Sequence, residues 1–96
     1  VFWNNANRLV QEKFIMSDVI MKRLIMENLP GTDKGEASLI YMRIAVQQDM
    51  KSLGKKYEEA QFQRCLNELH DAQSLFLFTN GWVKPTQAGL RGFNLT

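Results

Sequence analysis

Cys65 and His70 are the two side chains of this chain whose types suggest nucleophilic chemistry. A catalytic thiol needs an imidazole within hydrogen-bond reach to take its proton. The two residues lie five positions apart in a segment with helical spacing, and at ~100° per residue they point about 140° away from each other. They therefore cannot form a catalytic pair within one helix. We expect Cys65 to be a small core residue and His70 to lie at the edge of the core.

The chain offers few groups that could hold a metal or a cofactor. It contains one cysteine and one histidine, whereas a structural zinc site needs about four such ligands. No carboxylate cluster has the spacing of a calcium loop. Gly31 and Gly35 flank a loop without the Gly-x-x-x-x-Gly-Lys phosphate cradle. We therefore predict no cofactor, no metal and no enzymatic activity.

Length and composition suit one domain. The chain has 96 residues, is 45% hydrophobic and carries a net charge of +2, which neither supports nor excludes a nucleic-acid partner. Its apolar runs are far shorter than the roughly 20 residues that span a bilayer, and no secretory signal opens it. One unpaired cysteine fits a reducing compartment. We expect a cytoplasmic, nucleoid or nuclear protein that is neither secreted nor in a membrane; starting at Val1, the chain leaves open whether it is a fragment.

The N-terminal segment has apolar residues at helical spacing from Phe2 to Phe14. Ser17 and Asp18 can cap a second helix that turns Ile20, Met21, Leu24 and Ile25 inward. Because the apolar stripe stays in phase across Ser17, one long helix is the alternative. We divide the chain into an amphipathic arm at residues 1–16, for packing or dimerisation, and a domain at residues 17–96.

The next predicted helix runs from Glu36 to Ser52, after a loop that contains Pro30 and Gly31. Its apolar residues take two sides: Ala37, Ile40, Tyr41 and Ile44 on one, and Leu39, Met42, Val46, Met50 and Leu53 on the other. A helix that is apolar on both sides is buried on both sides, in the core or in a subunit contact. Gly54 fits the left-handed position after the helix end.

A further helix is predicted from Tyr57 to Gln73, with a single apolar edge. That edge carries Phe62, Cys65, Leu66 and Leu69, and the opposite edge carries Tyr57, Ala60, Arg64, Asn67 and Asp71. The predicted core brings this helix together with the helix from Glu36 to Ser52 and the helix that Ser17 caps. Its residues are Phe62, Leu66, Leu69, Ile40, Ile44 and Leu24.

A β-hairpin is predicted to follow. Ser74 to Thr79 is rich in strand formers, Asn80-Gly81 is typical of a type I′ turn, and Trp82 to Lys84 returns until Pro85 ends the strand. Thr86 can cap a last short helical turn. In an alternating strand one face carries Phe76, Phe78 and Val83, which we expect on the helices. The other carries Leu75, Leu77 and Trp82 and needs cover from the N-terminal helix, a second copy or another protein.

The stretch from Ile44 to Phe93 resembles winged helix-turn-helix domains. The resemblance rests on the order helix, Gly-containing turn, helix, strand, tight turn and strand, followed by the phrase Thr86-x-x-Gly89-Leu90. It implies a mostly α fold with a C-terminal β-hairpin. The superfamily includes domains that bind protein as well as domains that bind DNA.

The resemblance makes residues 57–73 the recognition helix, which enters the major groove, and residues 75–85 the wing. Gln61 and Arg64 are types that read adenine and guanine edges, while lysines near the helix start contact phosphates. The residues that the resemblance assigns to DNA are Lys55, Lys56, Tyr57, Ala60, Gln61, Arg64, Asn67 and Lys84.

Charge argues in the other direction. Between Tyr57 and Gln73 one basic residue stands against four acidic ones, a net charge of −3, and acids repel phosphates. Two hypotheses therefore stay open. The first is a DNA-binding domain of a transcriptional regulator or of a replication or mobile-element protein, acting as a homodimer on double-stranded DNA. The second is a protein-interaction module whose interface residues are Phe2, Trp3, Leu75, Leu77 and Trp82.

Overall fold

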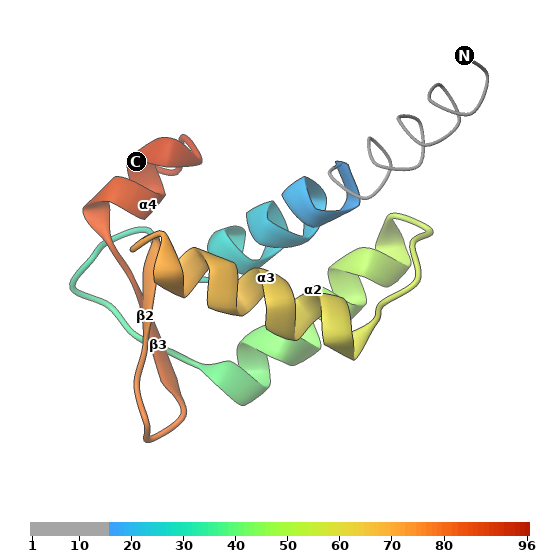
Figure 1. Cartoon of the computed structure of the whole chain (residues 1–96), viewed down its shortest axis with the longest axis horizontal. Coiled ribbons are helices and arrows are strands. Elements are labelled where there is room, and N and C mark those ends of the chain that lie inside the picture. Colours follow the sequence, from blue (N-terminus) through green and yellow to red (C-terminus); the bar gives the residue numbers. More distant parts are fainter. Residues whose placement is uncertain (1–15) are drawn as a thin grey trace, which may run out of the picture.

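The computed structural model describes residues 16–96, which are mostly helical with a small three-stranded antiparallel sheet (Figure 1). In chain order the elements are a helix at residues 16–27, called the N-terminal helix below, then β1 (Ala37–Ser38), α2 (Leu39–Ser52), α3 (Glu59–Asp71), β2 (Leu75–Leu77), β3 (Trp82–Pro85) and α4 (Gln87–Gly92). The predicted class, mostly α with a C-terminal β-hairpin, is confirmed. The predicted amphipathic arm, with Phe2 and Trp3, lies outside the described residues.

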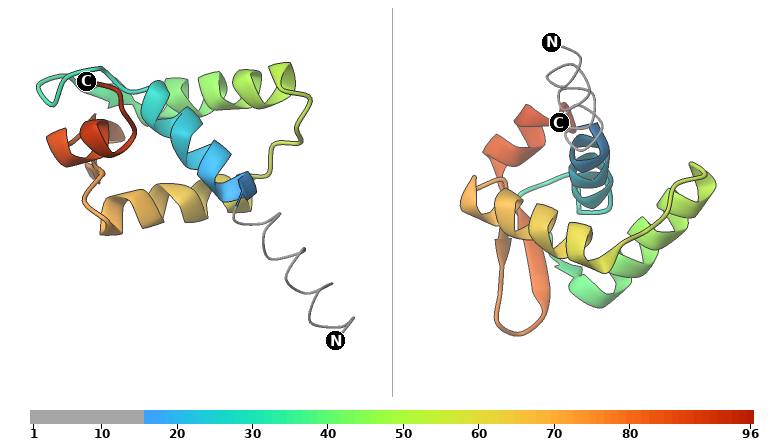
Figure 2. Two further views of the ribbon diagram at one scale, coloured as in Figure 1. Left: turned by 90° about the horizontal axis from the view of Figure 1, so that it is seen from above. Right: turned by 45° about the vertical axis from the view of Figure 1, so that its right-hand side comes forward.

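The N-terminal helix runs diagonally across α2 and α3 (Figure 2, left). It buries Met21, Ile25 and Met26 completely against them. The prediction that Ser17 and Asp18 cap this helix is wrong, because Met16 is already helical. The side chains of Ser17 and Asp18 instead accept hydrogen bonds from Gln61 of α3.

A short strand precedes α2, where the sequence predicts helix from Glu36. Ala37 and Ser38 pair with Val83 and Trp82 of β3, so α2 begins only at Leu39. The backbone N–H of Leu39 donates to the carbonyl of Gly81 at 2.9 Å, which ties the start of α2 to the hairpin turn. Two residues are too few to show the alternation from which a strand is recognised.

Only one of the two apolar sides of α2 is buried within the described chain. Met42, Val46 and Met50 are at most 2% exposed, whereas Ile40 is 65% and Ile44 43% exposed. The prediction that Ile40 and Ile44 belong to the core is therefore wrong. Leu53, predicted on the same side as Met42 and Val46, is also exposed.

The turn between α2 and α3 has the expected left-handed residue. Gly54 has φ +68°, which a residue without Cβ adopts readily. The N–H of Lys55 donates to the carbonyl of Met50, and that of Gly54 to the carbonyl of Lys51, at 2.9 and 3.0 Å. These two bonds form a Schellman motif that closes α2.

α3 buries the edge that its sequence predicts: Phe62, Cys65, Leu66 and Leu69 are at most 3% exposed. The helix is shorter than predicted at both ends. Tyr57 stays outside it and packs on Phe62, with ring centroids 5.9 Å apart. At the other end Gln73 adopts φ +60° and reverses the chain toward β2.

The sheet has the strand order β1-β3-β2. Leu75 pairs with Pro85 and Leu77 with Val83 on its inner face, and Leu75, Val83 and Pro85 are buried. The outer face carries Phe76, Phe78 and Trp82, which are between 42% and 46% exposed. The predicted faces are right for Val83 and Trp82 but exchanged for the first strand, where Leu75 and Leu77 lie on the inner face and Phe76 and Phe78 on the outer one. Both sets are apolar, so alternation alone does not say which one meets the helices.

The hairpin turn is not of the predicted type I′. That type needs positive φ at both central residues, whereas Gly81 has φ +86° and Asn80 does not share this conformation. The N–H of Phe78 donates to the carbonyl of Trp82, and the N–H of Gly81 donates back to Phe78. A three-residue loop that ends on a left-handed glycine results, with the Asn80 side chain accepting from the N–H of Trp82.

The phrase Thr86-x-x-Gly89-Leu90 has a structural explanation. The Thr86 hydroxyl accepts from the N–H of Gly89 at 2.9 Å, confirming the predicted cap, and donates to the carbonyl of Gln73 at 2.6 Å. Gly89 lies so close to the residue before β2 that a Cβ at this position would come within 2.0 Å of the Ser74 carbonyl oxygen. Leu90 then enters the core at 1% exposure.

Candidate nucleic-acid interface

The outer side of α3 is exposed along its length. In Figure 1 α3 runs across the front of the molecule, with no described element lying over this side. All residues of the predicted outer edge that lie within the helix are exposed: Ala60, Arg64, Asn67 and Asp71. A helix of 13 residues with one free side has a shape that the major groove admits.

Arg64 and Gln61, the two predicted base-reading residues, are both in contact with the N-terminal helix. The Arg64 guanidinium Nη2 lies 2.6 Å from Asp18 Oδ1, and Gln61 Nε2 donates to the same oxygen at 3.0 Å. Gln61 Nε2 also donates to Ser17 Oγ at 2.7 Å. The Arg64 side chain therefore lies along the flank of α3 rather than pointing straight outward.

Asp18 is held as a carboxylate in this contact. Burial alone would raise the pKa of its carboxyl, but the hydrogen bonds from Gln61 and Arg64 outweigh burial and leave the pKa below its usual value. Donors directed at the charged form of an acid stabilise that form. Asp18 is thus ionised at neutral pH and offers Arg64 a full negative charge.

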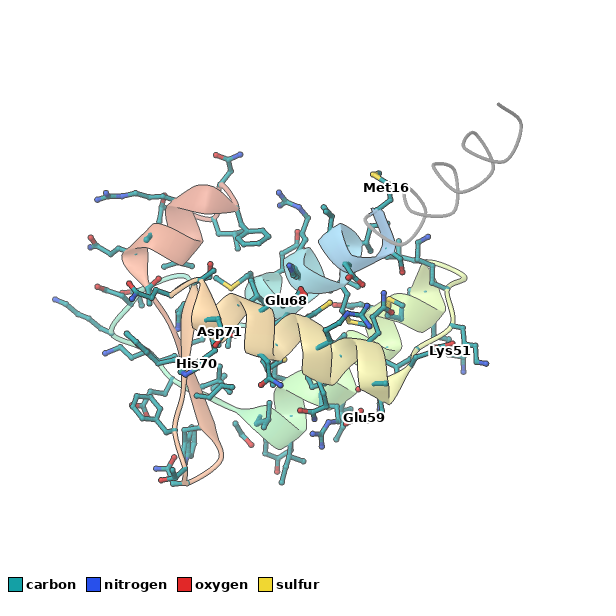
Figure 3. The ribbon with its side chains drawn as sticks, in the orientation of Figure 1. Met16, Lys51, Glu59, Glu68, His70 and Asp71 are labelled. Carbon is teal, nitrogen blue, oxygen red and sulfur yellow. The ribbon has the colours of Figure 1, made fainter. Side chains whose placement is uncertain are left out.

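The acidic residues of α3 lie mostly on its flanks, where cations neutralise them. Glu68 faces the N-terminal helix and pairs with Lys22 at 2.8 Å, and Glu59 faces α2 and pairs with Arg43 at 3.0 Å (Figure 3). Asp71 has no ion pair among residues 16–96. The excess of acid in the segment is therefore weaker on the outer side than the sequence count implies.

Tyr57 is the predicted DNA contact that the structure places least favourably. It is half-buried, and its hydroxyl donates to Glu59 Oε2 at 2.5 Å. Burial first and the Glu59 carboxylate second raise the pKa of the Tyr57 hydroxyl. Arg43, which lies 5.5 Å from the centroid of the Phe62 ring, completes this group. The sequence contains no signal for it, because its members come from two helices and the turn between them.

Three lysines gather at the turn before α3. Lys55 and Lys56 are exposed there, as predicted, and Lys56 lies 3.9 Å from Glu58. Lys51, in the last turn of α2, is also exposed and was not among the predicted residues (Figure 3). Its place four residues before Lys55 in the sequence was the available signal. Lys84 is half-buried on the outer sheet face, opposite Phe76.

A second exposed region is apolar, and we call it the apolar surface. It consists of Ile40, Tyr41 and Ile44 from α2 and Phe76, Phe78 and Trp82 from the hairpin. The two groups adjoin because Ser38, next to the start of α2, pairs with Trp82. Three of the predicted partner contacts lie in the described chain. Trp82 belongs to the apolar surface, whereas Leu77 is half-buried. Leu75 is fully buried and therefore unavailable to a partner.

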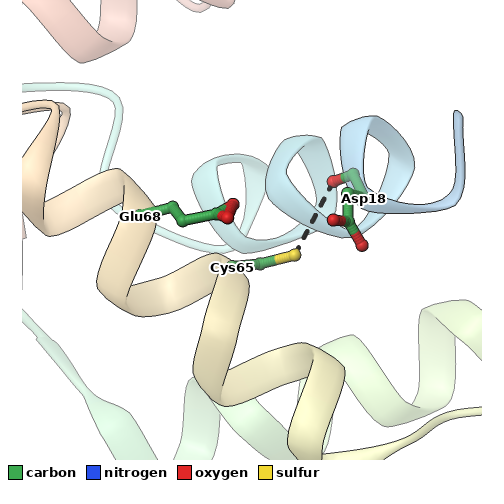
Figure 4. A group of neighbouring side chains, drawn as sticks. All are labelled: Asp18, Cys65 and Glu68. Atoms are coloured by element: carbon green, nitrogen blue, oxygen red, sulfur yellow. Dashed lines mark hydrogen bonds between the residues drawn. The ribbon is translucent and has the colours of Figure 1, made fainter. Parts of the chain in front are cut away.

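Cys65 lies near two carboxylates, with the Sγ atom and carboxylate oxygens of Asp18 and Glu68 within 4.8 Å of one another (Figure 4). The thiol is fully buried and donates to the Asp18 carbonyl at 3.9 Å. Burial first and the Asp18 charge second raise the pKa of Cys65 to about 11. Both carboxylates already pair with cations, Asp18 with Arg64 and Glu68 with Lys22, and these ion pairs explain why the two acids lie here.

His70 lies at the core edge as expected, its Nδ1 accepting from the N–H of Leu77 at 3.4 Å.

Comparison of the chain with family models, with curated proteins and with solved structures found no match. Among the described residues no helix has the length and apolar character needed to cross a membrane.

Proposed function

We propose that this chain is a winged helix-turn-helix domain that binds double-stranded DNA through α3. The observation that carries the proposal is the order of elements, in which α2, a Gly54 turn and α3 are followed by a hairpin whose strand β3 pairs with both β1 and β2. This order is compatible with the winged-helix topology, and it leaves the outer side of α3 exposed.

In the proposed complex the N-terminal half of α3 enters the major groove. Lys55 and Lys56 contact phosphates on one side of the groove, and Lys84 contacts them from the hairpin. Arg64 leaves Asp18 and reads a guanine edge. The pairing of Glu59 and Glu68 with cations supports the proposal, because paired acids repel phosphates less than free ones.

Substitutions in the proposed interface should separate base reading from phosphate contact. Arg64→Ala should lose about 1–3 kcal/mol of discrimination at one base pair. Lys55→Ala and Lys56→Ala should weaken binding to all duplex sequences alike, and each should lower the slope of log affinity against log salt by about one unit. Fluorescence anisotropy with sites selected from random duplex DNA measures both effects.

Arg91→Ala is the matched control, because Arg91 is an exposed cation on α4 and does not belong to the proposed interface. It should leave discrimination and salt slope as in the parent protein. DNA affinity that stays unchanged when Lys55, Lys56 and Arg64 are all replaced by alanine would reject α3 as the recognition helix.

A protein-interaction module is the second candidate, and the apolar surface favours it. Tyr41 is 75% and Ile40 65% exposed, and large contiguous apolar patches on monomers mark interaction sites. For this candidate we propose a second copy of the chain as the occupant, because two-fold homodimers are the commonest oligomers and use one self-complementary patch.

The dimer should show as a mass of two chains in sedimentation at tens of micromolar protein. Replacing Tyr41 and Trp82 by serine should convert it to the mass of one chain, because aromatic anchors dominate such interfaces. Leu53→Ser is the control, since Leu53 is exposed at the far end of α2. A monomer mass for the parent protein would remove the dimer proposal.

A further inference from the structure

We propose that Asp18 competes with DNA for Arg64, so that the N-terminal helix restrains the base-reading face of α3. The inference rests on the proposed DNA-binding function and deepens it. It assigns to the side chain of Asp18, which lies outside α3, a part in setting DNA affinity.

The contact that carries this inference joins residues 46 positions apart in the chain. One carboxylate oxygen of Asp18 accepts from Arg64 Nη2 and from Gln61 Nε2, at 2.6 and 3.0 Å. A guanidinium binds a carboxylate with the same donors that it offers to a phosphate or a guanine edge. Arg64 therefore cannot keep Asp18 and engage DNA with the same donor at once.

The restraint is of a strength that DNA can overcome. The Arg64 side chain is 48% exposed and the Asp18 side chain 21%, so water screens the pair and its contribution is that of a surface ion pair. Removing such a competitor should tighten DNA binding by about threefold to fivefold. The ion pairs of α3 with Lys22 and Arg43 involve Glu68 and Glu59, which do not belong to the outer edge.

The variant Asp18→Asn tests the inference on the full chain. It keeps the side-chain shape and an acceptor for Gln61 but removes the charge that attracts Arg64. We expect about threefold to fivefold tighter binding, at moderate salt, to a duplex that carries a site selected from random DNA. In an Arg64→Ala background the same substitution should have no effect, because no guanidinium remains to be released.

Glu68→Gln is the matched control, since it removes one negative charge from the same flank of α3 and its partner is Lys22. It should change affinity much less than Asp18→Asn. Thermal unfolding of each variant checks that the fold is retained, and a variant that unfolds is replaced by Asp18→Ser, which also lacks the charge.

The outcomes separate the inference from the proposed function. Equal DNA affinity of the parent protein and Asp18→Asn overturns the inference and leaves the function standing. A gain that persists in the Arg64→Ala background, or that Glu68→Gln matches, shows a general charge effect and also overturns it. Absence of DNA binding in the parent protein and in Asp18→Asn rejects both.

Discussion

Gly89→Ala should destabilise the domain by about 3 kcal/mol or more, as overpacking against a rigid backbone does. The added Cβ would lie 2.0 Å from the Ser74 carbonyl oxygen and 2.7 Å from its carbon, so α4 must move away from the end of α3. That movement breaks the bond from the Thr86 N–H to the same carbonyl, which measures 3.1 Å. It also withdraws Leu90 from the core. Urea unfolding followed by circular dichroism measures the loss.

Gly92→Ala is the control for this prediction. Gly92 belongs to the same helix, and a Cβ there would meet no atom within 4 Å. Alanine should be neutral or stabilise by up to about 1 kcal/mol, because it restricts the unfolded chain and favours helix. If the two substitutions had equal effects, the close approach of α4 to Ser74 would be refuted.

Leu66→Ala should cost about 2–5 kcal/mol of unfolding free energy. Leu66 is 1% exposed in the same cluster as Phe62 and Val46, and its truncation leaves a cavity that the three packed helices can close only in part. Ile40→Ala removes a side chain of similar volume from the exposed side of α2 and should change stability by less than about 0.5 kcal/mol.

The comparison of these two variants also tests the phase of both helices. A large loss for Ile40→Ala together with an unchanged midpoint for Leu66→Ala would mean that the buried sides of α2 and α3 are reversed. Chemical denaturation of both variants under the same conditions is sufficient.

The phase of α3 could be predicted from the sequence and that of α2 could not. α3 has one apolar edge, so only one orientation buries Phe62 and Leu66. α2 has apolar residues on two sides, and the side that meets the core depends on where the N-terminal helix and α3 lie. The hairpin was ambiguous for the same reason, since Leu75 and Phe76 are both apolar and the side of the sheet that meets the helices is set by tertiary packing.

The sequence predicts which residues of the candidate site share one side of α3. It does not predict the contacts that their side chains make with other helices. Helical spacing places Ala60, Arg64 and Asn67 on one exposed edge, as observed. The hydrogen bond from Arg64 to Asp18 depends on the angle at which the N-terminal helix crosses α3, which no local pattern encodes. A count of charges in the sequence could not reveal the ion pairs of Glu59 and Glu68 either, because their partners lie on other helices.

Binding of the full chain to mixed-sequence duplex DNA over a series of salt concentrations tests the central proposal most directly. Neutralising Z phosphates gives a slope of about −0.9Z in log affinity against log salt. Phosphate contacts from Lys55, Lys56 and Lys84 predict a slope of about −2.7 for each bound chain. A slope near zero, or no binding at physiological salt, would contradict DNA binding through α3.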